Sequence, residues 1–524
     1  MNALAFLLAL SPLALVLLLL LWRKQAADTA GALGLALCVA LAWGWCGTDP
    51  GVLWRALLSG LVGSLPVGIV IAASIWQISV MAEAGALASV AACLKRLTPE
   101  HKAVQVLLIA VCFGVLLTGL GATTMAILPP LLTALGYSVS AAIILSTLGY
   151  VAFCMYALLG VPVVILAGMA GQSLADTGHV LAQFMPLASV CVAFACLHAV
   201  GGRELMRKGA MPALIAGGGM GLAALELARL NLVTLTAIFA GLAGIILLLL
   251  YVAATGGVVY QREDSPDAAP PDTAHTGADT AKRLPLMRAL SPWLALVAAS
   301  LVLNTPALPL FDLVFSRWAM PVEIIPKAPE KLRLFWQAYT WVIICTLITL
   351  PVMRVNAAML TRATRRGLQR AWRPLVATAL YFMLAYVMNH SGKAADFSLP
   401  APEHNMILLL AQTTAQALGN AYAAAVPFVG LLGGFVSGSA SSGVAMLTHL
   451  QVVAAQSLEA KPLVLACASA VGAGLASAMS PSKLFSAGAS LDQPAAATQV
   501  MGYALVVSLG MTAVCAVLAA LWAF

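Results

Sequence analysis

Charged side chains are scarce in this 524-residue chain, in which Asp, Glu, Lys and Arg make up 9% of the residues and hydrophobic types 62%. A soluble protein carries about 25% charged and roughly 45–50% apolar residues. The mean hydropathy of +0.98 agrees with the excess of apolar residues. The shortage of charge therefore excludes a soluble globular protein and predicts an all-α polytopic membrane protein surrounded by membrane lipid.

Motifs of catalysis and metal binding are also missing. The sequence contains no HExxH, no GxSxG and no CxxC pair, and its ten cysteines have no accompanying His at zinc-ligand spacing. An enzyme needs a convergent set of nucleophile, base or metal ligands, whereas cysteines inside apolar segments are typical packing residues. We therefore predict neither an enzyme, nor a metal site, nor a cofactor.

Acidic residues are the rarer charged type: there are 19 Asp and Glu but 27 Lys and Arg, which gives a net charge of +8. The basic residues form short clusters between apolar runs and not one continuous basic surface, which predicts no nucleic-acid partner. By the positive-inside rule these clusters lie in the cytoplasm. They are Arg23/Lys24, Lys95/Arg96/Lys102, Arg203/Arg207/Lys208, Lys282/Arg283/Arg288 and Arg354, Arg362, Arg365, Arg366, Arg370 and Arg373.

Long apolar runs are abundant, and a run of about 20 apolar residues crosses a bilayer. Glycine and proline break two of the runs so strongly that neither can be a single straight helix. These two are 103–135 and 427–457. The other candidate spans are 4–22, 30–46, 60–82, 139–168, 180–200, 210–228, 231–255, 289–310, 334–353, 374–389, 406–425, 462–480 and 498–523.

The order of spans and basic clusters predicts the topology. Clusters on one side of the membrane must be separated by an even number of crossings. The rule holds except between residues 102 and 203, where an odd number of segments indicates that 103–135 is re-entrant or broken. The N-terminus is then expected outside.

One strongly polar block divides the chain. Residues 261–283 are rich in Pro, Asp, Thr and Ala and lack apolar periodicity, which is typical of a disordered linker. We therefore predict a membrane half over 1–260, a disordered cytoplasmic linker over 261–287 and a second membrane half over 288–524. The proline-containing loop 312–333 is expected to form an external cap with irregular backbone.

Two segments at corresponding places in these halves combine apolar residues with a tight cluster of Gly, Ser and Thr. Residues 112–133 read CFGVLLTGLGATTMAILPPLLT, and residues 427–444 read PFVGLLGGFVSGSASSGV. Paired interruptions of this kind are typical of the discontinuous helices of secondary transporters. The alternative is that small residues simply let helices pack closely in lipid.

A broken helix of this kind can bind an anion. Backbone N–H groups at the start of the second half-helix are free, and the positive end of its dipole favours negative charge. Hydroxyl groups add hydrogen bonds without adding charge. We therefore expect a small carboxylate as the ligand, with the donors Thr123, Thr124, Ser439, Ser441 and Ser442.

Several polar residues lie outside these two segments, and some of them have both a structural and a functional interpretation. His390, in the NHSG sequence after an apolar span, is either part of a helix cap or a partner for a proton or anion. Lys483 stands alone in an uncharged region and either reaches a lipid headgroup or supplies positive charge to an anionic substrate. Glu226 and Arg229 are expected to form a structural pair, and His198 and His449 to be polar residues at helix ends.

At these residues the chain resembles the lactate permease family of proton-coupled lactate and glycolate carriers. The similarity extends with gaps from about Trp54 to the C-terminus. It is strongest in LTPEHKAVQVLLIAVCFGVLLTG (97–119), MNHSG (388–392), PFVGLLGGFVSGSASSG (427–443) and AMSPSKL (478–484). The chain departs from the family pattern at Thr118 and Ala440, where the family has acidic residues.

The resemblance implies a fold of about 14 transmembrane segments in two repeats with paired broken or re-entrant helices. It also implies import of a small 2-hydroxy monocarboxylate across the cytoplasmic membrane by proton symport. The family's Gly-rich breaks map onto 114–126 and 437–443. The substrate-binding residues expected there are Thr118, Gly119, Ser437, Gly438, Ser439, Ser441 and Ser442, to which we add Lys483 for the substrate and His390 for coupling. Sodium-coupled transport of another small organic anion, or a non-coupled anion channel, remain the alternatives.

Overall fold

The computed structural model describes residues 3–21, 25–97, 101–260, 284–304, 308–326, 328–437, 439–491, 493 and 495–524. In this part of the chain ten helical segments are long and apolar enough to cross a membrane, and five apolar helices are shorter. The prediction of an all-α polytopic membrane protein is confirmed. The count of about 14 spans stays a prediction, and the linker 261–283 lies outside the described residues.

The helices of the first half share one pattern, in which apolar residues extend around most of each helix because lipid or other helices surround it. They are α1 (Ala3–Leu21), α2 (Ala27–Gly44), α3 (Pro50–Glu83), α4 (Ala86–Lys95), α5 (Lys102–Val106), η1 (Leu107–Phe113), α6 (Gly114–Gly119), α7 (Thr124–Ala134), α8 (Val139–Leu148), η2 (Val151–Tyr156), α9 (Ala157–Ala170), α10 (Leu174–Gln183), α11 (Met185–Lys208), α12 (Ala210–Arg229), η3 (Val233–Leu235) and α13 (Thr236–Ala254).

The second half adds one small β-hairpin to its helices. Its elements are α14 (Leu286–Ala289), α15 (Ser291–Asn304), α16 (Leu310–Asp312), η4 (Leu313–Arg317), β1 (Met320–Ile325), β2 (Ala328–Leu332), α17 (Ala338–Thr349), α18 (Ala357–His390), η5 (Pro402–His404), α19 (Met406–Leu418), η6 (Gly419–Ala421), α20 (Tyr422–Ser437), α21 (Ala440–Ser457), α22 (Pro462–Leu475), η7 (Ala476–Ala478), α23 (Pro481–Ala489) and α24 (Ala496–Trp522).

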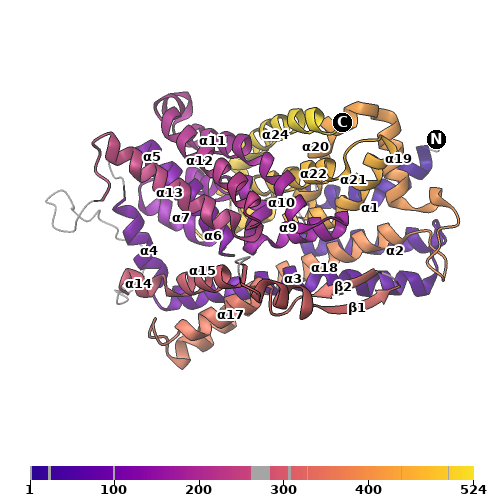
Figure 1. The fold of residues 1–524 in the computed structure, drawn as a ribbon, viewed down its shortest axis with the longest axis horizontal. Helices are drawn as coiled ribbons and strands as arrows, with labels where there is room; N and C mark the ends of the chain where they lie inside the picture. Colours follow the sequence, from indigo (N-terminus) through magenta and orange to yellow (C-terminus); the bar gives the residue numbers. More distant parts are fainter. Residues whose placement is uncertain are drawn as a thin grey trace.

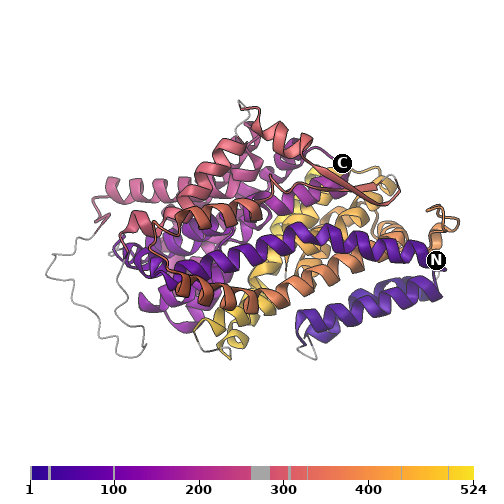
Figure 2. The same cartoon turned by 90° about the horizontal axis from the view of Figure 1, so that it is seen from below.

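Two long helices, α3 and α18, lie side by side. Each has 34 residues, a length of about 50 Å at 1.5 Å per residue, which exceeds the roughly 30 Å hydrocarbon layer. They pack antiparallel along their whole length (Figure 2). Their backbones touch where Gly60 faces Met383, because a Cβ added to Gly60 would lie only 2.6 Å from the Met383 Cα. One long helix from each half therefore joins the two halves.

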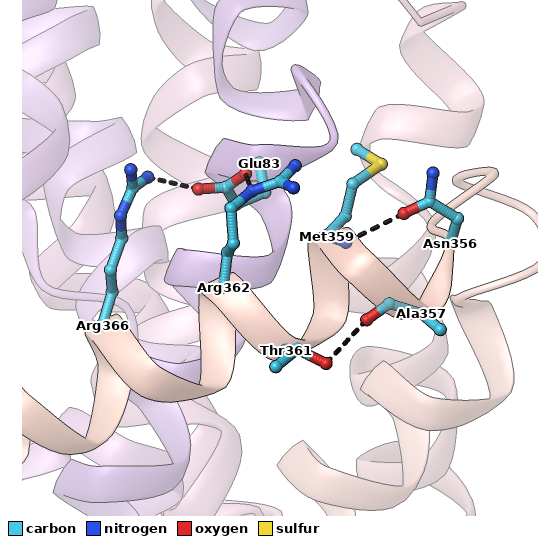
Figure 3. A network of polar contacts seen from close by, with 7 residues as sticks. All are labelled: Glu83, Asn356, Ala357, Met359, Thr361, Arg362 and Arg366. Carbon is cyan, nitrogen blue, oxygen red and sulfur yellow. Dashed lines mark hydrogen bonds and ion pairs between the residues drawn. The ribbon is translucent and has the colours of Figure 1, made fainter.

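An ion-pair cluster fixes one end of this helix pair (Figure 3). The carboxylate of Glu83, at the end of α3, pairs with Arg362 Nε at 3.2 Å and with Arg366 near the start of α18. The Glu83 side chain is only 12% exposed, whereas the two arginines are more than half exposed. Arg362 and Arg366 belong to the basic run 354–373, so these ion pairs connect the end of α3 to the start of α18.

We expect Glu83→Gln to lower the free energy of unfolding by about 1 kcal/mol. The substitution removes the carboxylate charge that pairs with both arginines, and this carboxylate is largely shielded from water. The melting temperature of the purified protein measures this loss. Glu226→Gln is the matched control, since Glu226 and Arg229 form an exposed pair at 2.7 Å. An equal shift for both variants would show that the position of Glu83 adds nothing.

The neighbours of the long helices indicate a repeat. In the first half, α1 and α2 form a helix pair, and α2 packs against α18 of the second half. In the second half, α15 and α17 form the equivalent pair, and α17 packs against α3. Each pair thus lies on the long helix of the other half. This exchange supports the predicted two-repeat architecture.

Three segments differ from expectation. The candidate span 374–389 is part of a longer helix, α18, which also includes most of the basic run 354–373, because the arginines of this run occupy one solvated face. The loop 312–333 was expected to be irregular, but it contains the antiparallel hairpin β1–β2, in which Met320 pairs with Leu332. The hairpin accommodates Pro321 because a two-stranded sheet has only edge strands.

The third difference is the span 139–168, which was expected as one continuous helix. The structure divides it into α8, the 3₁₀ turn η2 and α9. Leu158, Leu159 and Gly160 have positive φ values of 56°, 57° and 75° at this division, a region that L-residues adopt only at a cost. The backbone is therefore unwound inside an apolar segment, which in a membrane requires burial in protein.

Candidate functional site

The first predicted broken segment is a re-entrant helical hairpin. Its first arm is α5–η1–α6 and its second arm is α7, and the two run back along each other, since Gln105 Oε1 accepts a hydrogen bond of 3.0 Å from the Tyr137 hydroxyl. Gly121 forms the tip with φ +84°, and a Cβ there would lie 2.9 Å from Ser74 Oγ on α3. Only glycine satisfies both requirements.

The second broken segment, α20 and α21, folds back in the same way. Near its open end the Tyr422 hydroxyl donates to Gln451 Oε1 at 2.8 Å. Near the tip, a Cβ added to Gly443 would lie 2.9 Å from the Gly434 nitrogen. Two residues nine positions apart would lie about 13 Å apart along one straight helix, so this contact requires a reversal. The predicted interruptions at both places are confirmed.

The glycines of the second hairpin have a packing role. A Cβ on Gly430 would lie 1.8 Å from the Ser469 carbonyl oxygen, and one on Gly434 would lie 2.3 Å from the Ala473 carbonyl oxygen. Helix α20 therefore lies backbone against backbone on α22. The alternative interpretation of the segment, close packing of small residues, holds for these glycines, while the serines lie at the tip beyond them.

Each hairpin is followed by a discontinuous helix. In the first half this is α8–η2–α9, and in the second half it is α22–η7–α23. The second half of each discontinuous helix lies on a hairpin of the other repeat: α23 packs against α7, and α9 packs against α21. Each repeat thus packs the second part of its discontinuous helix on the hairpin of the other repeat.

The two helix breaks meet through side chains. Cys154 Sγ, in η2, lies 3.3 Å from Ser477 Oγ, in η7. The Lys483 Nζ, on the first turn of α23, donates to Ser477 Oγ at 2.8 Å and to the Tyr150 hydroxyl at 3.1 Å. It also lies 5.4 Å from the centre of the Tyr150 ring. We call Tyr150, Cys154, Ser477 and Lys483 the crossing cluster.

The crossing cluster is short of negative charge. Tyr150, Cys154 and Ser477 are each less than 5% exposed, and Lys483 is half-buried. The two hairpins and the two discontinuous helices, residues 102–137, 422–457, 139–170 and 462–489, contain no Asp or Glu. A cation inside a membrane is costly unless an anion lies beside it. The arrangement therefore favours binding of an anion at Lys483.

The predicted hydroxyl groups lie at or near the hairpin tips. Thr118 and Ser442 are buried, and within the described part of the chain Thr118 Oγ1 and Ser442 Oγ have no hydrogen-bond partner. Thr124 Oγ1 donates to the Ser146 carbonyl oxygen of α8 at 3.0 Å. Buried hydroxyls without partners are uncommon and costly. Two of the predicted donors are thus available to a ligand.

The remaining predicted residues occupy helix ends. Thr123 precedes α7 and Ser439 precedes α21, both with extended backbone. Gly119 ends α6, and Ser437 ends α20. Ser441 is buried in the first turn of α21, and Gly438 lies outside the described residues. The packing of α7 on α23 brings the helix that begins at Thr124 against the helix that carries Lys483, while the Lys483 Nζ donates to Tyr150 and Ser477.

His390 lies in a different place, at the junction of α18, α19 and the loop after α2. Its Nδ1 is 2.9 Å from the Tyr386 carbonyl oxygen. The next residues hold the junction: Ser391 Oγ accepts from the Met406 nitrogen, and the Gly392 nitrogen donates to Thr48 Oγ1. The structure therefore gives the NHSG sequence a capping role at this junction, and a coupling role for His390 stays a prediction. Lys393 and His449 are close enough to interact electrostatically with His390.

Sequence reasoning did not identify Tyr150, Cys154 and Ser477 as site residues. The first two lie in GYVAFCMYALLGVP (149–162), where Gly149, Gly160 and Pro162 signal a further break. Ser477 directly precedes the AMSPSKL block (478–484) that contains Lys483. Among the described residues no group of His, Cys, Asp and Glu is arranged to hold a metal.

Other openings and polar pairs lie elsewhere. An open groove of about 470 Å³ lies between β1 and the start of α3, lined by Trp54, Arg55, Leu58, Glu323, Ile324 and Pro326. His198 Nδ1 lies 3.0 Å from the Tyr503 hydroxyl. Neither feature involves a residue of the crossing cluster or of the hairpin tips.

Several known proteins are similar to this chain. The family model described as L-lactate permease matches residues 5–524. The L-lactate permease of Escherichia coli strain K12 is 22% identical over 450 residues, covering 80% of this chain and 78% of that protein. The L-lactate permease of Streptococcus iniae is 23% identical over 415 residues, covering 78% and 82%. The YdaH transporter of Alcanivorax borkumensis is 15% identical with a TM-score of 0.47, over 95% of this chain and 98% of that one.

Proposed function

Because the chain belongs to the L-lactate permease family, we propose that it imports a small 2-hydroxy monocarboxylate, such as lactate or glycolate, by proton symport. Membership of the family places the chain among multi-pass membrane transporters. The observation that carries the proposal further is the crossing cluster, where two interrupted helices present one lysine amine and no carboxylate. This chemistry suits a small anion.

The ligand carboxylate is proposed to accept hydrogen bonds from Lys483 Nζ and from the hydroxyls of Tyr150 and Ser477. Interrupted helices leave backbone N–H groups free at the starts of α7, α21 and α23, and these add partial positive charge. Thr118, Thr123, Thr124, Ser439, Ser441 and Ser442 are the proposed hydroxyl donors at the tips, together with the backbone of Gly119, Ser437 and Gly438. A 2-hydroxy group gives these donors and acceptors a second polar atom to recognise.

The two hairpins suit alternating access. The open end of the first hairpin, at α5, and the open end of the second, near α19, lie at opposite ends of the long axis (Figure 1). A substrate at the crossing cluster then has one hairpin between it and each side of the membrane. With the basic clusters inside, the N-terminus is outside and the linker is cytoplasmic.

Uptake by proteoliposomes tests the substrate and the coupling ion. Labelled lactate, glycolate and unhydroxylated short carboxylates are supplied with an imposed pH gradient and, separately, with a sodium gradient. We expect concentrative uptake of 2-hydroxy acids with the pH gradient. Accumulation driven by sodium would support the alternative coupling ion, equilibration without accumulation would support a channel, and failure of every 2-hydroxy acid to accumulate or compete would contradict the substrate.

Removing hydroxyls from both tips tests their role. We expect Thr118→Ala combined with Ser442→Ala to lower the rate of lactate uptake about tenfold, because these two buried hydroxyls have no partner among the described residues and each lost hydrogen bond to an anion is worth on the order of 1 kcal/mol or more. The amount of folded protein in the membrane should stay at the wild-type level. Unchanged uptake kinetics would leave both hydroxyls with a packing role only.

A further inference from the structure

The crossing cluster contains one basic group, and we propose that this group, Lys483, carries the coupling proton. Its amine takes up a proton when the substrate carboxylate binds and releases it when the substrate leaves. The inference rests on the proposed function and adds to it the identity of the proton carrier.

The contacts of Lys483 support this role. Its Nζ hydrogen-bonds to Ser477 Oγ and to the Tyr150 hydroxyl, and both partners are uncharged. The ion pairs of the described residues use other cations, and none involves Lys483. An ammonium without a fixed counter-ion is stabilised by whichever anion enters the site. By linkage, protonation of the amine strengthens binding of the anion by the same factor.

The titratable groups around α23 do not offer another carrier. Of the elements packed against it, α7, α8 and η7 contain no titratable side chain. Helix α24 carries Cys515 and Tyr503, and the Tyr503 hydroxyl is bonded to the Ala195 carbonyl oxygen of α11. Tyr150 and Cys154 lie beside Lys483, but a phenol or thiol that ionised would bring a second negative charge to an anion site.

The proton and charge balance is complete. In the empty site the side chain is Lys–NH₂, and in the loaded site one proton and one R–COO⁻ give Lys–NH₃⁺ beside R–COO⁻. No bond of the substrate is broken. The site has zero net charge in both states, so neither state moves an uncompensated charge through the low-dielectric interior. One proton therefore accompanies each monocarboxylate.

Lys483→Arg separates binding from coupling, because a guanidinium is permanently charged. In proteoliposomes we expect this variant to exchange labelled lactate for unlabelled lactate at a rate within about tenfold of wild type. It should not accumulate lactate when a pH gradient is imposed. Gradient-driven accumulation by Lys483→Arg at the wild-type level would overturn the inference and direct attention to His390 and His449.

Proton uptake on binding gives a second measurement. Purified wild-type protein in a weakly buffered solution with a pH-sensitive dye should take up about one proton for each lactate bound, with binding measured by calorimetry. Lys483→Arg should bind lactate without taking up protons. Wild-type binding without proton uptake would overturn the inference while leaving the proposed function in place.

Two further outcomes are distinguished. If Lys483→Arg does not fold, Lys483→His provides another titratable base, and coupled uptake should persist with its pH profile moved to lower pH. An unmoved profile for this variant would also overturn the inference. If wild-type protein neither binds nor transports any 2-hydroxy acid, the proposed function itself fails.

Discussion

Lys483→Met is expected to raise the KM for lactate uptake at least about 30-fold without reducing the amount of folded protein. The substitution keeps an unbranched side chain of similar length and removes only the charge and the donors. Lys483 is the single charged residue of the discontinuous helix α22–η7–α23. Loss of one partner from a desolvated charge pair costs about 2–5 kcal/mol, and each 1.4 kcal/mol corresponds to a factor of ten.

The control for this prediction is Lys208→Met. The ammonium of Lys208 pairs with Glu204 at 2.6 Å, and its side chain is 71% exposed, so its removal is expected to leave uptake within twofold of wild type. Binding of lactate to purified protein gives a readout that does not depend on coupling. If Lys483→Met binds lactate with wild-type affinity, the carboxylate does not lie at the crossing cluster.

Much of the fold was predictable from the amino-acid composition and from the positions at which apolar runs are interrupted. The shortage of charge identified a membrane protein, and the Gly, Ser and Thr clusters identified both hairpin tips. Helix α6 ends at Gly119 and α7 begins at Thr124, while α20 ends at Ser437 and α21 begins at Ala440. These breaks are visible in a sequence because polar and flexible residues replace apolar ones within a few positions.

The crossing cluster was not predictable in the same way. The break at Leu158 and Leu159 uses apolar residues in left-handed conformations, and hydropathy does not distinguish an unwound apolar segment from a helical one. The partners of Lys483 are also distant in sequence, since Tyr150 is 333 positions away. Only the packing of one repeat on the other brings them together, and a single sequence carries no signal for that contact.

The start of the long helix α18 was also not predictable from the sequence. The candidate span was placed at 374–389, after the basic run from Arg354 to Arg373, because charges are incompatible with the interior of a bilayer. The helix of 34 residues begins earlier, at Ala357, and includes most of this run. Charge therefore marks where the apolar part of the helix begins, but it does not indicate where the helix itself begins.

Gly430→Ala is expected to be the most destabilising of the single-methyl additions in the chain. Its new Cβ would lie 1.8 Å from the Ser469 carbonyl oxygen, on the backbone of α22. Ordinary van der Waals contact needs about 3.4–4 Å, and no side chain rotation relieves a contact between two backbones. Helix α20 must therefore move away from α22, and the second hairpin tip moves with it.

The yield of monodisperse protein and its melting temperature measure this effect. We expect the yield of Gly430→Ala to fall about tenfold and the remaining protein to lose lactate uptake, since overpacking alone typically costs about 1–3 kcal/mol and a backbone clash costs more. Gly510→Ala is the matched control, because Gly510 lies on α24 with no atom within 4 Å of the added Cβ. Helix propensity favours alanine at both positions, so any difference between the variants reports the α20–α22 contact. Equal yields would mean that the hairpin does not rest on α22 as closely as described, and the position assigned to its tip serines would then be wrong.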